Sequence, residues 1–247
     1  MRARVPPFAR IKWTTMFERQ GLHWLLLGLL LAGLLSATAL VCRDEAFLVG
    51  SCAGLSTAAW FWMAIAFPVA HQTYVWLCWR LELHKHWFTR HLGEAGFRLY
   101  TAGFAFLGLG RLVVLIGLGI ANENTLAVNE TWLDALATLL LLPAVYLFYS
   151  VARYFTFKRA LGIDHFDPSY RTKPLVREGI FRYTSNGMYT FGFLAVWLPG
   201  LYTASQAALL AALFSHVYIW VHYYCTELPD MKRIYGGATL SATVSGS

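Results

Sequence analysis

Apolar residues follow one another in runs that are long enough to cross a lipid bilayer, and short polar stretches separate these runs. About 20 apolar residues in a helix span the hydrocarbon core, and a helix satisfies its own backbone hydrogen bonds inside the lipid. The pattern therefore predicts an all-α protein, a polytopic membrane bundle of about six transmembrane helices. The predicted helices cover residues 22–42, 47–68 (or as far as Trp79), 97–120, 132–155, 188–202 and 205–225.

The composition agrees with a membrane protein. The chain of 247 residues is 57% hydrophobic and only 13% charged, whereas soluble domains carry about 25% charged residues. A basic arm, residues 1–21, precedes the first apolar run and resembles the start of a signal peptide. The run itself lacks a clear small-x-small cleavage site before Arg43 and has the length of a bilayer span, so we expect a retained helix.

The positive charges are distributed unevenly across the predicted membrane. Of the 20 Lys and Arg residues, all but Arg43 and Arg111 fall in the N-terminal arm, the second and fourth loops, and the C-terminal end. Since Lys and Arg accumulate on the cytoplasmic side, both termini are predicted to be cytoplasmic. The net charge of +7 then belongs mostly to a face that meets anionic lipid headgroups, and no nucleic-acid partner is expected.

Two polar motifs bracket the last hydrophobic stretch. They read GIFRYTSNGMY, residues 179–189, and TELPDMKRIYG, residues 226–236. The apolar residues between them suit a hairpin of two membrane helices, with Pro199-Gly200 at its turn. A hairpin returns the chain to the side it left, so both motifs are expected at one membrane face. The Arg, Tyr, Asn and Glu side chains that meet there form a candidate site.

Other polar residues in or beside the predicted spans have both a structural and a functional explanation. Arg111 lies within the third span, where a charge costs about 2.5 to 3.5 kcal/mol. It either binds a carboxylate or a lipid phosphate, or it snorkels or forms an internal ion pair. Asp164-His165 follows Gly162 in a loop, as a capped turn or as part of a lid over a polar ligand. Aromatic residues near His222 form an interfacial anchor or faces for a methylated ammonium group.

Eight histidines and four cysteines raise the question of a metal site. The histidines lack the repeated HxxxH or HxxHH clusters of membrane di-iron enzymes, and His216 and His222 do not share a helical face. The cysteines are dispersed and form no CxxC pair, which is typical of small apolar residues in helices. We therefore expect no metal.

The two motifs resemble those of the integral-membrane phospholipid N-methyltransferase and isoprenylcysteine carboxyl methyltransferase superfamily. There, a segment close to GIYRYxRHPMY, or NPMY in the phospholipid enzymes, precedes a helical hairpin, and EExxL with an aromatic-glycine step follows it. This chain departs from the pattern at residues 185–187, which read Ser-Asn-Gly, and at Leu228 in the second acidic position. The matching residues are Gly179, Ile180, Arg182, Tyr183, Asn186, Met188, Tyr189, Gly192, Glu227, Met231 and Tyr235-Gly236, with Ala160-Leu161-Gly162 as an upstream ALG turn.

The resemblance implies a division of the chain and a function. It implies N-terminal helices at 22–131, a methyltransferase-like core at 132–237 and a flexible tail at 238–247. The implied enzyme uses S-adenosylmethionine to methylate a membrane lipid, most directly the amine of phosphatidylethanolamine or its methylated intermediates, in phosphatidylcholine biosynthesis.

The resemblance also implies roles for individual residues. Glu227 and Tyr189 are the expected catalytic residues, with Glu227 as a base or as a partner of the cofactor's amino acid end. The expected cofactor-binding residues are Gly162, Gly179, Arg182, Tyr183, Asn186, Gly187 and Glu227. The expected lipid-binding residues are Arg98, Arg111, His222 and Tyr223.

Other functions stay open at this point. The acceptor is alternatively a prenylated-cysteine carboxylate or another small lipophile, although Asn186 before Met188-Tyr189 favours a phospholipid. NADPH-dependent steroid reductases have a related C-terminal hairpin. A catalytically silent scaffold or lipid-binding protein would explain the altered residues 185–187. The first two spans, outside the resemblance, would serve a homo-oligomer under either view.

Overall fold

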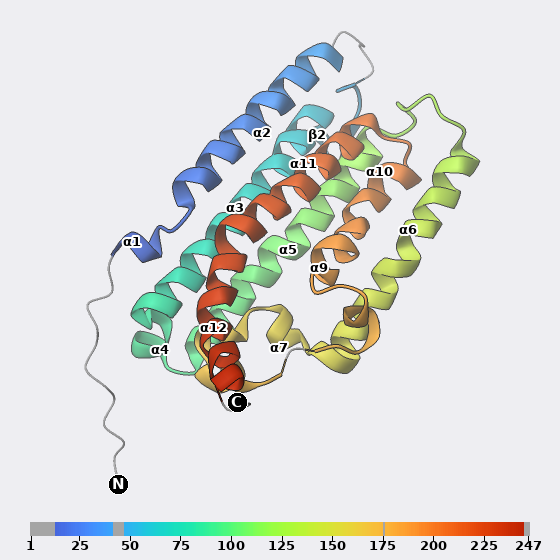
Figure 1. Cartoon of the computed structure of the whole chain (residues 1–247). Coiled ribbons are helices and arrows are strands. Elements are labelled where there is room, and N and C mark those ends of the chain that lie inside the picture. Colours follow the sequence, from blue (N-terminus) through green and yellow to red (C-terminus); the bar gives the residue numbers. More distant parts are fainter. Residues whose placement is uncertain (1–12, 42–46, 175, 245–247) are drawn as a thin grey trace.

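The computed structural model describes residues 13–41, 47–174 and 176–244. Within these residues helices account for almost all regular structure, and the long helices run side by side as a bundle (Figure 1). Most of the predicted basic arm, together with Cys42 and Arg43, lies outside the described residues.

Long helices build the bundle, and two of them continue through a π-helical turn. The turn η1 (Val151–Phe155) follows α6, and η5 (Tyr223–Glu227) follows α11 and leads directly into α12 (Leu228–Val244). The long helices are α2 (Gln20–Val41), α3 (Thr57–Lys85), α5 (Ala95–Ala121), α6 (Glu130–Ser150) and α11 (Gln206–His222).

Short elements connect the long helices. Two strands, β1 (Ser51–Cys52) and β2 (Leu55–Ser56), pair antiparallel. The short helices are α1 (Trp13–Met16), α4 (Trp87–Leu92), α7 (Phe157–Ala160), α8 (Ile163–Phe166), η2 (Pro168–Thr172), η3 (Gly179–Arg182), α9 (Gly187–Thr190), η4 (Gly192–Trp197) and α10 (Leu198–Tyr202).

The helices have the length and surface of membrane spans. Among the described residues, four stretches are long and apolar enough to cross a membrane: Gln20–Leu40, Ala95–Ala121, Glu130–Phe155 and Gln206–Gly236. Large apolar side chains such as Leu29, Phe106 and Leu139 are exposed on these helices, as expected where lipid surrounds them. The predicted helical membrane bundle is confirmed, and the chain is an integral membrane protein. The count of six spans and the cytoplasmic termini stay predictions.

The second span begins at Thr57 rather than at residue 47. The two strands form a hairpin before it, because Ala53 and Gly54 adopt positive φ angles of 50° and 78° at the turn. Ser56 then caps α3 by accepting a hydrogen bond from the Ala59 amide. The helix continues past Trp79 to Lys85 with Pro68 inside it, so it reaches the short loop elements below the bundle (Figure 1).

The fifth predicted span is not one continuous helix. Residues 187–202 form α9, η4 and α10 in succession. A Cβ at Gly192 would come within 2.7 Å of the Leu147 side chain of α6, and Pro199, which cannot donate a backbone hydrogen bond, begins a new turn in α10. These short pieces pack between α6 and α11 (Figure 1).

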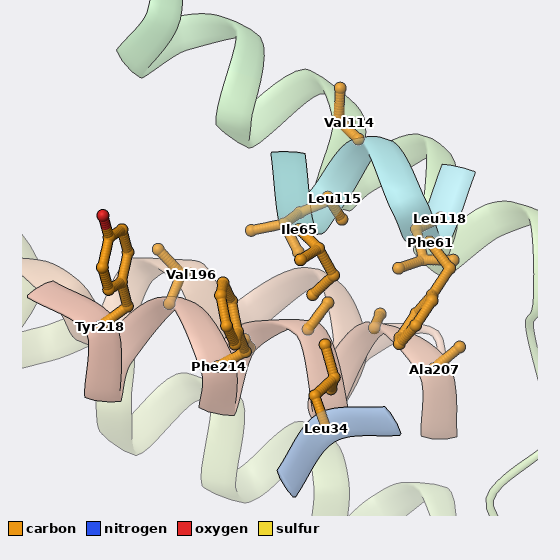
Figure 2. Close-up of a cluster of buried hydrophobic side chains, with 14 of the residues drawn as sticks. Leu34, Phe61, Ile65, Val114, Leu115, Leu118, Val196, Ala207, Phe214 and Tyr218 are labelled. Atoms are coloured by element: carbon orange, nitrogen blue, oxygen red, sulfur yellow. The ribbon is translucent and has the colours of Figure 1, made fainter. Parts of the chain in front are cut away.

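Helix α11 occupies the centre, where it contacts α2, α3 and α5. Figure 2 shows Leu34 of α2 and Ile65 of α3 beside Phe214 of α11 in this core. Small side chains allow neighbouring helices to approach closely, and the buried face of α11 carries four of them: Ala207, Ala208, Ala211 and Ala212.

Candidate active site

A cavity of about 380 Å³ lies inside the bundle, and both halves of the chain form its walls. Helices α3 and α5 supply one wall, and α6 with the segments after it supplies the rest. Two groups of polar residues line it. The first, here called the loop end, comprises Gly162, Asp164, His165, Tyr189 and Glu227; the second, the deep end, comprises His71, Arg111 and His222.

The two sequence motifs meet at the loop end. The Tyr189 hydroxyl donates a hydrogen bond to the Glu227 carboxylate. Tyr189 lies in α9 within the first motif, and Glu227 is the last residue of η5 within the second. Single π-helical turns occur frequently at functional sites, and this one carries Glu227 to the cavity. The meeting predicted from a hairpin is thus observed, although one arm of the hairpin is broken.

Aromatic rings surround Tyr189. Its ring centroid lies 5.3 Å from that of Tyr223 and 5.9 Å from that of Trp220. Tyr189 lines the cavity, whereas Tyr223 and Trp220 lie outside its lining. An aromatic face attracts a methylated ammonium group by about 0.5 to 2 kcal/mol, and of these three rings only Tyr189 is placed to offer one to the cavity.

The segment that begins at Gly162 and continues into α8 packs tightly against α3. Gly162 has a φ of 77°, a conformation that glycine adopts without strain, and a Cβ there would come within 2.6 Å of the Trp79 ring. The His165 ring stacks on Trp79 with centroids 4.2 Å apart. Asp164 accepts a hydrogen bond from the Tyr235 hydroxyl of α12. Glycine at 162 therefore lets the loop reach α3, where Asp164 and His165 are buried.

A buried ion pair joins α3 to α12 beside this loop. Arg80 Nε lies 2.9 Å from Asp230 Oδ1, and both side chains are at most 1% exposed. Arg80 also donates to the carbonyl oxygens of Thr15 and Met16 at 2.8 and 3.2 Å. His165 Nε2 lies 3.6 Å from Asp230. One guanidinium thus fastens the start of the described chain, the end of α3 and the C-terminal helix around the loop end.

Two further arginines bring positive charge to the loop end. Arg159 lines the cavity, and its buried Nε has no hydrogen-bond partner. Arg171 Nε donates to the Asp164 carbonyl oxygen at 3.2 Å. Burial lowers the pKa of the Arg171 guanidinium, while Asp164 and Asp167 act in the opposite direction. The carboxylates of this region therefore have cations close by.

The deep end differs in its hydrogen bonding. His71 of α3, Arg111 of α5 and His222 of α11 are each at most 5% exposed. Among the described residues, both ring nitrogens of the two histidines and the Nε of Arg111 have no hydrogen-bond partner. The Arg111 guanidinium carbon lies 5.3 Å from the Phe193 ring centroid. Within the described part of the chain Arg111 forms no ion pair, so an internal ion pair does not explain its position there.

Several predicted site residues lie outside the cavity lining. Gly179, with a φ of 59°, and the buried Gly187 hold the first motif against α6, where Ser150 Oγ accepts a hydrogen bond from the Ile180 amide at 3.1 Å. Arg98, Arg182 and Tyr183 are exposed. The residues outside the lining are Arg98, Gly179, Arg182, Tyr183, Asn186, Gly187 and Tyr223.

Four residues of the site were not found from the sequence. Trp79, Arg80 and His71 belong to a helix outside the methyltransferase resemblance. Asp230 lies within the second motif, but its partner Arg80 is 150 positions away along the chain, so no local pattern connects them. In the sequence, a histidine within an apolar run, as at His71, was the one available signal of a buried polar residue at the site.

Comparison with known proteins assigns the C-terminal part of the chain. Residues 132–238 match the family model for phospholipid methyltransferase. This match supports the resemblance of the motifs to the membrane methyltransferase superfamily, and it supports methyl transfer to a lipid. It includes Tyr189 and Glu227 but neither α3 nor α5.

A curated relative points the same way. Over 78 residues the chain is 27% identical to a phosphatidylethanolamine N-methyltransferase of Komagataella phaffii, a match that covers 32% of this chain and 9% of that protein. The chain therefore corresponds to a small part of that relative. No solved structure matches the chain.

Proposed function

We propose that this protein transfers a methyl group from S-adenosylmethionine to the amine of phosphatidylethanolamine or of its methylated intermediates. The observation that carries the proposal is the hydrogen bond between Tyr189 and Glu227 on the cavity wall. It brings the two superfamily motifs together on one cavity, inside the segment that matches phospholipid methyltransferase.

The loop end offers groups that fit S-adenosylmethionine. Asp164 Oδ1 and Arg159 Nε are buried there without hydrogen-bond partners in the part of the chain that the structure describes, and both residues line the cavity. A carboxylate and a guanidinium match the ammonium and carboxylate groups of an amino acid. Trp79 and Phe155 also line the cavity and add aromatic surface for contact with a purine ring. When bound, S-adenosylmethionine supplies an electrophilic methyl group on its sulfonium.

Glu227 handles the proton in this proposal. A protonated amine has no lone pair, so it must lose a proton before its nitrogen can attack a methyl group. The Glu227 carboxylate accepts that proton, while the hydrogen bond from Tyr189 holds the carboxylate at the cavity wall. Positioned general bases contribute about 10²- to 10⁴-fold to a rate. The apolar side chains that make up most of the wall exclude water from the reacting groups.

The cavity reaches the lipid-facing surface of the bundle. Leu112 of α5 and Phe148 of α6 both line it, and they are 36% and 52% exposed. Phe157, just beyond η1, also lines the cavity and is exposed. A side opening between α5 and α6 lets a phospholipid enter from the bilayer with its acyl chains still in lipid.

The test is methyl transfer by the purified full chain in bilayers that contain phosphatidylethanolamine. With isotopically labelled S-adenosylmethionine, we expect label in mono-, di- or trimethylated ethanolamine lipids. Bilayers of phosphatidylglycerol, which has no amine, serve as the control and should yield no labelled lipid. If calorimetry detects no binding of S-adenosylmethionine to folded protein, the proposal is wrong.

A further inference from the structure

The deep end of the cavity combines three polar side chains from three different helices. His71, Arg111 and His222 all line the cavity and all are buried. Gly108 lies one turn before Arg111 on the same face of α5. A Cβ at Gly108 would lie 3.4 Å from the His71 ring, so α5 and α3 approach closely at this point.

These side chains lack the partners that buried polar groups normally have. Most buried polar atoms in proteins are hydrogen-bonded, and a charged side chain inside a membrane normally pairs or faces a water-filled cavity. Arg111 has the Phe193 ring at 5.3 Å, which is a weaker contact than a carboxylate. An anion that entered the cavity would meet the guanidinium and two imidazoles with free ring nitrogens.

We propose that Arg111, together with His71 and His222, binds the phosphate group of the phospholipid acceptor. This inference rests on the proposed function for the identity of the lipid. The planar guanidinium donates two parallel hydrogen bonds to phosphate oxygens, and a neutral imidazole donates one more through its N–H.

The position of the deep end agrees with the order of groups in the lipid. His222 precedes Glu227 by five residues, which corresponds to about 7 Å along a helix. In an ethanolamine phospholipid a two-carbon linker separates the amine from the phosphate. With the amine at Glu227, the phosphate therefore extends toward His222 and Arg111. The acyl chains leave past Leu112 and Phe148, which are partly exposed to lipid.

Ligand-dependent stabilisation tests this phosphate site without measuring turnover. The probes are dioctanoyl phosphatidylcholine, dioctanoylglycerol and inorganic phosphate, each added to the full chain in detergent without S-adenosylmethionine. We expect the phospholipid to raise the melting temperature of the wild-type protein more than dioctanoylglycerol does. Arg111→Gln should lose this difference, whereas Arg153→Gln, an exposed arginine outside the cavity lining, should keep it.

Each alternative outcome has a definite meaning. Equal stabilisation by phospholipid and dioctanoylglycerol, or full retention of the difference in Arg111→Gln, would overturn the proposal. Stabilisation by inorganic phosphate alone would assign the site to a free anion and would also overturn it. Arg111→Lys keeps the charge but loses the paired hydrogen bonds of the guanidinium, so it should retain part of the difference in melting temperature between the two lipids. This variant replaces Arg111→Gln if Arg111→Gln does not fold.

A kinetic measurement separates this proposal from the proposed function. Removing hydrogen bonds to a charged group costs about 10- to 100-fold in affinity, so Arg111→Gln should raise KM for phosphatidylethanolamine by that factor with kcat nearly unchanged. Active enzyme with an unchanged KM would disprove the phosphate site and leave the methyltransferase proposal intact. Phospholipid-dependent stabilisation without any methyl transfer would support the phosphate site and contradict the methyltransferase proposal.

Discussion

The two ends of the cavity differ in how far protein contacts satisfy their buried polar groups. At the loop end, Glu227 accepts a hydrogen bond from Tyr189, and nearby Asp230 pairs with Arg80. These contacts connect segments that are far apart in the sequence. At the deep end, the ring nitrogens of His71 and His222 and the Nε of Arg111 have no hydrogen-bond partner within the described residues.

The loop end thus has two carboxylates that protein side chains orient, although Asp164 Oδ1 and Arg159 Nε there have no partner among the described residues. A buried donor or acceptor without a partner costs about 1 to 3 kcal/mol, so folded proteins normally provide such a group with a hydrogen-bond partner. In the proposed function, the contact with Tyr189 holds Glu227 in place before substrate binds, which is how preorganised sites act. The deep end lacks such contacts, and a phosphate would provide them.

The largest effect is expected at the loop end, from Glu227→Gln. Glutamine keeps the shape of the side chain and can still accept a hydrogen bond from Tyr189, but it cannot take up a proton. We expect kcat to fall about 10²- to 10⁴-fold, with the Kd for S-adenosylmethionine nearly unchanged, as measured by label transfer and calorimetry. Glu178→Gln removes an exposed carboxylate outside the cavity lining and should leave kcat unaltered. Unchanged turnover in Glu227→Gln would remove this residue from the chemistry.

The loop end also shows which parts of the site were predictable. The meeting of Tyr189 and Glu227 followed from two polar motifs and a hairpin between them. The helices at 97–120 and 132–155 correspond closely to α5 and to α6 with η1, because each is bounded by polar residues. Local patterns of this kind are visible in a sequence.

Contacts between distant segments were not predictable in the same way. The start of α3 depends on a hairpin turn at Ala53 and Gly54. The division of the fifth predicted span into α9, η4 and α10 depends on how closely Gly187 and Gly192 pack on α6. The hydropathy of both regions is compatible with a simple continuous helix. Arg80 and Asp230 pair only because α3 extends below the bundle to meet α12, and periodicity contains no information on such an encounter.

The next largest effect is a difference in stability between variants of two buried arginines, Arg80 and Arg111. Only Arg80 has a carboxylate partner among the described residues. Arg80→Gln leaves Asp230 buried and unpaired, and breaking such a pair costs about 3 to 5 kcal/mol of stability. Arg111→Gln removes a buried charge that has no carboxylate partner among the described residues, so we expect no loss of stability in the absence of lipid. Unfolding of both variants in detergent measures the difference.

A second substitution checks the cause of this difference. Adding Asp230→Asn to Arg80→Gln removes the unpaired carboxylate and should restore part of the lost stability. A strong loss of stability in ligand-free Arg111→Gln would show instead that Arg111 has a structural role, and the contrast between the two ends would fail.

A smaller effect is expected from Gly162→Ala, which acts on the loop end alone. The residue has a φ of 77° and its Cβ would meet the Trp79 ring at 2.6 Å, and strain of this kind costs about 1 to 3 kcal/mol. Because the loop holds Asp164 and Arg159 at the cavity, the variant should bind S-adenosylmethionine more weakly by calorimetry. Stabilisation by dioctanoyl phosphatidylcholine should persist, since the deep end is untouched.

Gly33→Ala is the matched control for this loop variant. Gly33 lies in α2, and nothing stands within 4 Å of a Cβ at that position. Alanine favours a helix over glycine by about 1 kcal/mol, so stability should rise slightly while cofactor binding stays the same. Loss of phospholipid stabilisation in Gly162→Ala would show that the two ends of the cavity are coupled.

The smallest effect is expected from a second ion pair that also involves α12. Glu18 and Arg233 lie 3.0 Å apart, but their side chains are 40% and 39% exposed. Exposed pairs contribute about 0 to 1 kcal/mol, and high salt weakens them because the Debye length falls to about 3 Å at 1 M. Glu18→Gln should therefore lower the melting temperature slightly at low salt and not measurably at high salt. Both pairs tie a more N-terminal segment of the chain to α12. A loss as large as that of Arg80→Gln would show that any ion pair to α12, and not the burial of charge beside the cavity, determines the stability of the loop end.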